Sequence, residues 1–256
     1  YKKMNLVYNL VDFFLMNNNE KKIFNYIKRN KKKIIFDVGS FKGKFTGKII
    51  QIDTNRTNSK FYLFDPNPNG FAYIKKLKNN NKNIFYNCIG LDIEVKKKIF
   101  HLNKFFEAAG SSFQPIMKND KMWNLSRKKF LELFNIFNKK KLDEYEKIEV
   151  RTNTIDNFCK KSRIKYIDLL KIDSEGHEEY ILKGSKDLLK KNQVNVIYVE
   201  ILSQKNNFKS KKKKIINFLN NYGFKFIKEY PIKSVSIFSN LKSSDLLLVN
   251  ENYKSE

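Results

Sequence analysis

Polar and glycine residues follow the first strongly apolar run of the sequence, and their types suit the binding of a ligand. The run 34–36 leads into Asp37, Gly39, Ser40 and Gly43, so the two glycines have a G-x-x-x-G spacing. Gly39 permits a tight turn, and Gly43 lets a following helix begin close to a ligand. This spacing is neither the G-x-G-x-x-G dinucleotide motif nor a P-loop, so an ordinary strand-to-helix turn explains it equally well.

Asp65 ends the next apolar run, about one βαβ unit further along the chain. A carboxylate at this place can accept hydrogen bonds from both hydroxyls of a ribose. An Asp is also a good N-cap for a helix after Pro66, which is the alternative interpretation. Together the glycine turn and Asp65 indicate a nucleoside-bearing cofactor, because the turn leaves room beside a ribose that the carboxylate would hold.

Alternating strands and helices are expected to position these residues. The apolar and periodic runs predict strands at 33–38, 60–65, 83–90, 96–102, 148–152, 166–172, 194–201, 224–229 and 245–249, with helices at 43–50, 70–77, from 154, at 177–190 and at 209–222. Continuous apolar strands that alternate with helices predict a parallel sheet covered on both faces. The fold class is therefore a doubly wound α/β sheet, in which ligands bind at the carboxyl ends of the strands.

Two segments depart from this alternation. The pattern of residues 1–32 predicts an N-terminal helical cap, and residues 33–256 are predicted to form the main domain. Residues 103–147 are rich in Phe and contain Trp123, the single Trp of the chain, with a helical stretch at about 117–140. We interpret 103–147 as an insertion that covers the substrate, although aromatic side chains at such spacing are more often core residues.

The charge of the chain is strongly positive. Its 52 Lys and Arg residues exceed the 26 Asp and Glu residues by 26, a balance typical of proteins that bind nucleic acid or another polyanion. Only five of the 52 are Arg, and Asn, Ile and Phe are abundant as well. Since Lys, Asn, Ile and Phe share A/T-rich codons, a skewed base composition is the favoured explanation. The lysine runs are also spread along the chain without a periodic Tyr or Phe platform beside them, which is typical of solvated faces.

The cysteine and histidine content indicates no metal centre. Cys88 and Cys159 are far apart, and His101 and His177 are the only histidines, so no zinc-ligand spacing occurs. The longest apolar stretch, 6–16, is too short to span a membrane and is interrupted by polar residues. No signal peptide is apparent, and free thiols are typical of a reducing compartment, so we expect a cytoplasmic protein.

One resemblance covers about residues 33–250. The sequence resembles the FkbM family of S-adenosylmethionine-dependent methyltransferases in seven motifs, all in family order: IIFDVGSFKGKFT (34–46), FYLFDPNP (61–68), NCIGL (87–91), GSSF (110–113), TNTIDNF (152–158), LLKIDSEGHEEYILKG (169–184) and VIYVEI (196–201). The resemblance implies a class I methyltransferase fold, a Rossmann-like sheet of seven strands with an antiparallel final strand pair. The domain 33–256 would then be the methyltransferase domain.

The resemblance also implies roles for individual residues. S-adenosylmethionine would be the cofactor, with Asp37, Gly39, Ser40 and Gly43 around its methionine part. Asp65 would hold the ribose. Ile89 and Gly90, after the third strand, would lie near the adenine, and Asp173 would lie near the sulfonium and the acceptor.

Three positions depart from the family pattern. Phe41 stands where the family usually has Asn, so a polar contact in the turn is missing. Asp65 replaces the more usual Glu, which is a longer side chain of the same chemistry. Leu91 follows Gly90 and displaces the acidic residue to Asp92, which puts the adenine contact in doubt.

The resemblance implies methyl transfer to a hydroxyl, and a neutral hydroxyl is a poor nucleophile that needs alignment and often a base. Asp173, His177 and Glu200 are the catalytic candidates, and Glu175 is a weaker one. Asp173 has the best position, but it serves equally well as an anchor for the cofactor's ammonium group. His177 is alternatively an exposed or capping residue at the start of a helix. Glu200 ends an apolar strand, where an unpaired carboxylate would be costly.

The leading hypothesis is therefore O-methylation of a sugar, polysaccharide or related glycoconjugate, with a small molecule or glycan as acceptor. One alternative is an RNA methyltransferase of the same fold, motivated by the positive charge. A second is a noncatalytic polyanion-binding module on a methyltransferase scaffold. No pattern in the sequence indicates an oligomeric state.

Overall fold

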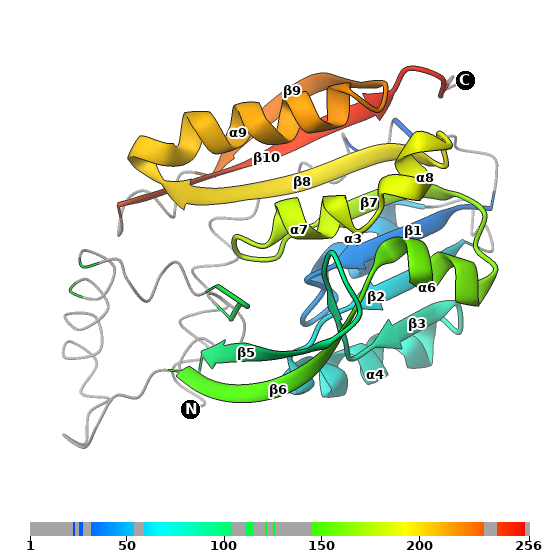
Figure 1. The fold of residues 1–256 in the computed structure, drawn as a ribbon. Helices are drawn as coiled ribbons and strands as arrows, with labels where there is room; N and C mark the ends of the chain where they lie inside the picture. The colour runs from blue at the N-terminus through cyan, green and yellow to red at the C-terminus, as the bar shows by residue number, and fades with distance from the viewer. Residues whose placement is uncertain are drawn as a thin grey trace.

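The computed structural model describes residues 23, 26–27, 32–53, 59–103, 111–114, 121, 125, 145–232 and 240–253 (Figure 1). The helices expected before residue 30 and at 117–140 lie outside these residues, as do Trp123 and most of the segment 103–147. The division into an N-terminal cap, a main domain and an insertion therefore stays a prediction.

A seven-stranded sheet forms the centre of the molecule, with the order β3-β2-β1-β7-β8-β10-β9. Its strands are β1 (Ile34–Val38), β2 (Lys60–Phe64), β3 (Ile84–Asn87), β7 (Ile167–Ile172), β8 (Val194–Gln204), β9 (Phe224–Ile232) and β10 (Leu241–Asn250). Strand β10 is antiparallel to both of its neighbours, whereas the pairs among β3, β2, β1, β7 and β8 are parallel. The predicted sheet, with an antiparallel final pair, is confirmed.

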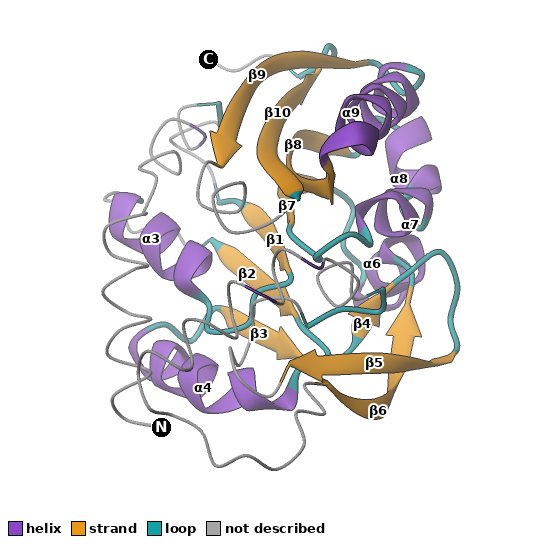
Figure 2. Cartoon of the chain, turned by 90° about the vertical axis from the view of Figure 1, so that its left-hand side faces the viewer, coloured by secondary structure: helices purple, strands orange, loops and turns teal. Residues whose placement is uncertain are grey.

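Helices cover both faces of this sheet (Figure 2). On one face lie α3 (Lys44–Ile52) and α4 (Phe71–Asn80), and on the other lie α6 (Ile155–Ser162), α7 (Glu178–Lys183), α8 (Lys186–Lys190) and α9 (Lys205–Asn220). A 3₁₀ turn, Pro68–Gly70, precedes α4. Among the described residues, no helix is long and apolar enough to cross a membrane.

The single helix predicted at 177–190 is two helices, and that prediction was wrong. Helix α7 ends at Gly184, where the chain approaches the backbone of Asp92 so closely that a Cβ would lie 2.1 Å from its carbonyl oxygen. Helix α8 begins one residue later, after Ser185. The break therefore lies at the contact with another part of the chain, which apolar periodicity does not reveal.

Successive side chains of the central strands point to opposite faces of the sheet and form an apolar core on each face. In β1, Ile35 belongs to the cluster that includes α3 and α4, and Phe36 belongs to the cluster that includes α7 and α9. Every residue of β7 is buried, as a strand with helices on both faces requires. Polar residues nevertheless enter this buried layer, among them Asp37 and Lys171, which are partners in the register of β1 and β7.

A second sheet of three strands stands beside the first, with the order β4-β6-β5. It contains β4 (Gly90–Leu91), β5 (Lys97–Asn103) and β6 (Tyr145–Asn153). The sequence predicted strands at these places but no separate sheet, and its third strand, 83–90, divides into β3 and β4. Strands β5 and β6 alternate charged and apolar residues, so one face stays exposed and neither strand suits the buried centre of a parallel sheet.

The end of β1 is fixed by a close approach to β7. Gly39 has a φ of +72°, and a Cβ at this position would lie 1.6 Å from the carbonyl oxygen of Asp173. Its N–H donates to the carbonyl of Phe64 at the end of β2 (2.9 Å), and the N–H of Asp173 donates to Val38 (3.0 Å). Only glycine fits here, because both the conformation and the space exclude a side chain.

We expect Gly39→Ala to destabilise the protein much more than Gly223→Ala. Gly223 has a similar φ of +75°, but no atom lies within 4 Å of its added Cβ. Gly223→Ala should therefore lower the free energy of unfolding by about 1–2 kcal/mol, the cost of a left-handed residue. Gly39→Ala adds a backbone clash, for a loss of at least about 3 kcal/mol. Urea denaturation followed by circular dichroism measures both, and equal losses would contradict the clash.

Candidate active site

A cleft of about 220 Å³ opens at the carboxyl ends of β1, β2 and β7, beside the second sheet. Its lining residues come from six parts of the chain: Val38, Gly39, Phe41, Phe64, Asp65, Pro66, Asn67, Ile89, Gly90, Leu91, Phe100, Ser111, Phe113, Asp173, Ser174, Glu175, His177 and Ile181. Six residues singled out from the sequence are among them: Gly39, Asp65, Ile89, Gly90, Asp173 and His177. The expected place of the site, at the carboxyl ends of the parallel strands, is thus hollow.

Asp65 is held by two backbone hydrogen bonds. Its Oδ2 accepts from the N–H of Phe41 (2.8 Å), and its Oδ1 accepts from the N–H of Asn67 (2.8 Å). Burial raises the pKa of Asp65 to about 6, although these two bonds and the positive charge of Lys171 oppose the shift. Each oxygen still has a further lone pair that can accept from a ligand. Asp65 also accepts from an N–H two residues on, the geometry of a turn residue.

Phe41 adopts a left-handed conformation with a φ of 37°. Asn tolerates this region better than bulky residues do, which gives a physical reason for Asn at this place in the family. The side-chain contact of an Asn is missing, as expected. The backbone of Phe41 nevertheless reaches Asp65, and its carbonyl oxygen would lie 2.5 Å from a Cβ on Gly70. The turn is therefore held by its main chain.

The second sheet and residues 111–114 supply an apolar wall. The ring of Phe113 covers Gly90 so closely that a Cβ there would lie 2.3 Å from it. Phe113 also meets Phe100 edge to face, with ring centroids 5.1 Å apart. The hydroxyl of Ser112 donates to the carbonyl oxygen of Glu175 (3.1 Å), which joins this wall to the loop after β7.

Three of the predicted cofactor residues lie behind the cleft surface. Asp37 is fully buried and accepts from the hydroxyl of Thr46 on α3 (2.7 Å). Ser40 is also buried, and a Cβ on Gly43 would touch the side chain of Ile74 on α4. None of the three lines the cleft. These three residues therefore lie within the turn and not at the cleft surface.

Carboxylates from three strands converge on Lys171. Its Nζ lies 3.1 Å from Asp37 Oδ1 and 3.4 Å from Asp173 Oδ2. Glu200 on β8 forms a hydrogen bond with Asp173 and accepts another from the hydroxyl of Ser243. Burial raises the pKa of Glu200 well above its usual range, and the charge of Asp173 adds to the shift. Asp173 lines the cleft, and Glu200 is its neighbour on β8.

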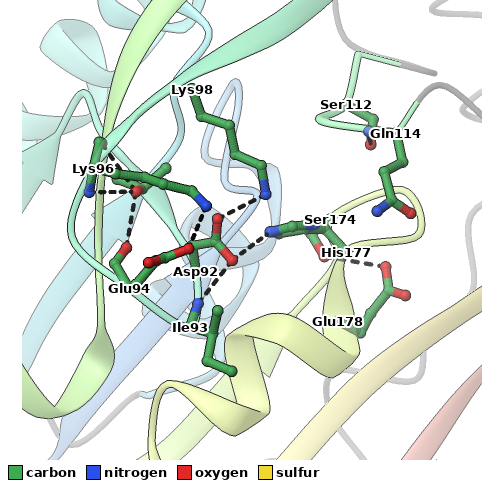
Figure 3. A network of polar contacts seen from close by, with 11 residues as sticks. Asp92, Ile93, Glu94, Lys96, Lys98, Ser112, Gln114, Ser174, His177 and Glu178 are labelled. Atoms are coloured by element: carbon green, nitrogen blue, oxygen red, sulfur yellow. Dashed lines mark hydrogen bonds and ion pairs between the residues drawn. The ribbon is translucent and has the colours of Figure 1, made fainter.

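His177 belongs to a buried polar network (Figure 3). Its Nε2 lies 3.1 Å from Asp92 Oδ1, and the Nζ of Lys98 lies 2.8 Å from Asp92 Oδ2. The imidazole packs between Phe113 and Tyr180, with ring centroids 4.9 Å and 4.7 Å away. Burial lowers the pKa of His177, and the charge of Lys98 lowers it further. The histidine occupies the N-cap position of α7, but it is fully buried and its side chain makes no cap bond.

Asp92, the displaced acidic residue, does not line the cleft. Burial acts to raise its pKa, but hydrogen bonds from Lys98 and from the N–H of Ile93 hold that pKa below its usual range. Asp92 therefore joins the second sheet to the start of α7 through His177. Glu178 at the same helix start accepts from the N–H of Gly176 (2.7 Å), and a negative charge is favourable at a helix N-terminus.

Sequence reasoning missed Lys171 and Phe113. Lys171 sits in an otherwise apolar run, and a charged residue within a continuous buried strand is a signal that could have identified it. Phe113 carried no such signal, because its contact with Gly90 joins residues far apart in the chain.

A doubly wound sheet of this order, with one antiparallel strand and a cleft at its carboxyl edge, is the arrangement expected for a class I methyltransferase. Residues 37–226 match the sequence pattern of the methyltransferase FkbM domain. The chain therefore belongs to the FkbM methyltransferase family. A comparison with proteins of curated function finds no significant match to this sequence.

A comparison with solved structures finds matches at low sequence identity. The crystal structure of methyltransferase FkbM from Methylobacillus flagellatus KT superposes with a TM-score of 0.50 at 9% identity, covering 84% of this chain and 43% of that one. This chain thus spans less than half the length of that protein. The N-methyltransferase NodS from Bradyrhizobium japonicum WM9, solved with S-adenosylhomocysteine, has a TM-score of 0.45 at 6% identity, covering 91% of this chain and 86% of that one. An rRNA methylase from Streptococcus thermophilus has a TM-score of 0.45 at 10% identity, covering 91% of this chain and 93% of that one.

The raised pKa of Asp65 should make the stability of the protein depend on pH. A carboxyl whose pKa is raised in the folded state binds a proton that the unfolded chain releases, so its contribution falls as pH rises through about 4 to 6. Relative to Asp65→Asn, the native sequence should lose about 2 kcal/mol of unfolding free energy between pH 4 and pH 7. Urea denaturation of both proteins across this range measures the difference. If the unfolding free energies of the two proteins change with pH in the same way, the raised pKa of Asp65 is contradicted.

Proposed function

We propose that this protein transfers a methyl group from S-adenosylmethionine to a hydroxyl group of a sugar, polysaccharide or related glycoconjugate. The charge of the cleft is the observation that supports this most. The chain carries a net charge of +26, yet the described residues that line its cleft include Asp65, Asp173 and Glu175 and no Lys or Arg. Such a cleft favours a cationic donor and a neutral acceptor over a polyanion.

The residues of the cleft fit this cofactor. S-adenosylmethionine, when bound, supplies a methyl group on a positively charged sulfur. Asp65 would accept hydrogen bonds from the ribose hydroxyls, and the apolar side chains of Ile89 and Leu91 would contact the adenine. Gly39 leaves the main chain open at the cleft surface, because no side chain projects there. Asp173 would attract the ammonium group of the methionine part.

The acceptor hydroxyl must lose a proton as it is methylated, and Glu200 is the group we propose to take it. Glu200 is adjacent to Asp173, and its raised pKa suits a group that exchanges a proton near neutral pH. His177 remains the second candidate, because it lines the cleft, its Nδ1 has no hydrogen-bond partner among the described residues, and burial favours its neutral form. In that case Asp92 would orient the imidazole.

Ion pairs account for part of the positive charge that suggested RNA as an acceptor. Three lysines of the run 211–214 on α9 contact carboxylates of the protein itself: Lys211 with Glu178 (2.8 Å), Lys212 with Glu229 (2.7 Å) and Lys214 with Glu179 (2.9 Å). A lysine paired within the protein contributes less to a phosphate-binding surface than an unpaired one. The arrangement therefore favours a neutral acceptor.

Cofactor binding gives the first test of this proposal. S-adenosylhomocysteine should bind in calorimetric titration, and Asp65→Ala should weaken it at least tenfold, since a charge-assisted hydrogen bond contributes about 1.5–3 kcal/mol. Asp168→Ala is the matched control. Asp168 is a buried carboxyl that accepts from the N–H of Ile34 (2.7 Å) on β1 and does not line the cleft. Absence of binding by the native sequence would contradict the proposed cofactor.

Transfer of a labelled methyl group tests the acceptor. We expect label from S-adenosylmethionine in alkali-stable ethers of neutral sugars or glycans, and none in RNA. Glu200→Gln should lower turnover by about 10²-fold or more, the usual contribution of a general base, while cofactor affinity is retained. Glu229→Gln, which loses a surface ion pair with Lys212, should keep full turnover. Label in RNA alone would overturn the sugar proposal.

A further inference from the structure

Lys171 is a buried lysine at the centre of the sheet, with 7% of its surface exposed. It lies on β7, between Asp37 of β1 and Tyr198 of β8 in the strand register. On this face the sheet carries α3, whose Phe45 ring lies 5.8 Å from the Lys171 Nζ. A lysine in such a place is costly unless its charge is compensated, so its partners are informative.

The ammonium of Lys171 has four oxygen neighbours, and three of them belong to residues that line the cleft. Besides the carboxylates of Asp37 (3.1 Å) and Asp173 (3.4 Å), these are the carbonyl oxygens of Gly39 (3.1 Å) and Val38 (3.4 Å). One side chain thus joins the turn after β1 to the end of β7, the two segments that Gly39 brings into contact.

Several carboxyl groups face this ammonium. They come from every strand around it: Asp37 of β1, Asp65 after β2, Asp173 after β7 and Glu200 of β8, with Asp245 of β10 next to Glu200. Burial disfavours the charged form of Lys171, but Asp37 and Asp173 outweigh it and raise the pKa of the lysine. The lysine is therefore charged at neutral pH, and it compensates a cluster that would otherwise consist of carboxylates alone.

We propose that Lys171 is a positioning residue whose positive charge holds the carboxylates of Asp37 and Asp173 together at the cleft, so that Asp173 can receive the cationic end of the methyl donor. This inference rests on the proposed function, and it assigns the role of an anchor to Asp173. Without the lysine, the carboxylates would repel one another in a buried corner, and the cluster would keep an additional proton at neutral pH. The donor would then bind only when that proton leaves.

Proton linkage of ligand binding separates this role from a structural one. In the native sequence, affinity for S-adenosylhomocysteine should be nearly constant between pH 6 and pH 8. In Lys171→Met the affinity should rise with pH, by up to tenfold per unit where one proton is released. Calorimetric titration in phosphate and in Tris, two buffers that differ in ionisation enthalpy, should show that proton as a difference in apparent binding enthalpy.

Three variants complete the experiment. Lys171→Arg keeps the charge and should restore behaviour independent of pH. Lys171→Gln keeps an uncharged hydrogen-bond donor for the Gly39 carbonyl and should show the same pH-dependent affinity as Lys171→Met. It provides the test if Lys171→Met does not fold. Lys33→Met is the matched control. Lys33 is a buried lysine 3.5 Å from Asp53, and it precedes β1 at the end opposite the cleft, so its loss should leave the pH dependence unchanged.

The outcomes distinguish the two proposals. If the native sequence binds S-adenosylhomocysteine and neither Lys171→Met nor Lys171→Gln shows pH-dependent affinity, the role of Lys171 is wrong and the proposed function stands. A uniform loss of affinity at every pH would also overturn it, since a purely structural role predicts that result. If the native sequence does not bind the ligand at all, the proposed cofactor is wrong and this inference falls with it.

Discussion

The approach of β1 to β7 at Gly39 is the constraint on which the rest of the structure depends. The turn after β1 packs on the carbonyl of Asp173 with no room for a Cβ, and this contact places Asp37, Asp65 and Asp173 around one small volume. Carboxylates so close together repel one another unless a cation lies between them. Lys171 meets this need from within β7. Gly39 and Lys171 therefore depend on each other, because Gly39 lets the strands come together and Lys171 compensates the negative charge that this approach concentrates.

The charge of the whole chain and the charge of the cleft have opposite signs. Lysines dominate the sequence, but those with partners in the structure mostly pair with carboxylates outside the cleft, such as Lys211 with Glu178. Carboxylates at the carboxyl ends of the strands instead face the cleft or lie just behind it. Net charge alone therefore gives a poor guide to the acceptor. Local potential decides which molecules enter, and within a narrow cleft it is set by the nearest groups.

The sequence predicted the central sheet well, because continuous apolar runs leave few alternatives to a parallel sheet with helices on both faces. Six of the predicted site residues line the cleft, since the residues after parallel strands converge at one edge. It failed where position depends on contacts between distant segments. The second sheet, the break at Gly184 and the pairing of Asp92 with His177 all arise from such contacts. Asp37 was assigned to the right turn, but its side chain is buried and accepts from Thr46 instead of lining the cleft, which a motif does not show.

The second sheet supplies a wall of the cleft and is fixed to the rest of the molecule from two sides. Gly90, Leu91 and Phe100 form part of this wall, and the network of His177, Asp92 and Lys98 fixes the sheet to α7. Strands β5 and β6 pair along the full length of β5, and the Phe113 ring packs against Gly90. The hydroxyl of Ser112 donates to the carbonyl oxygen of Glu175, which joins the same wall to the loop after β7. The shape of the cleft therefore depends on contacts between the two sheets as well as on the central sheet itself.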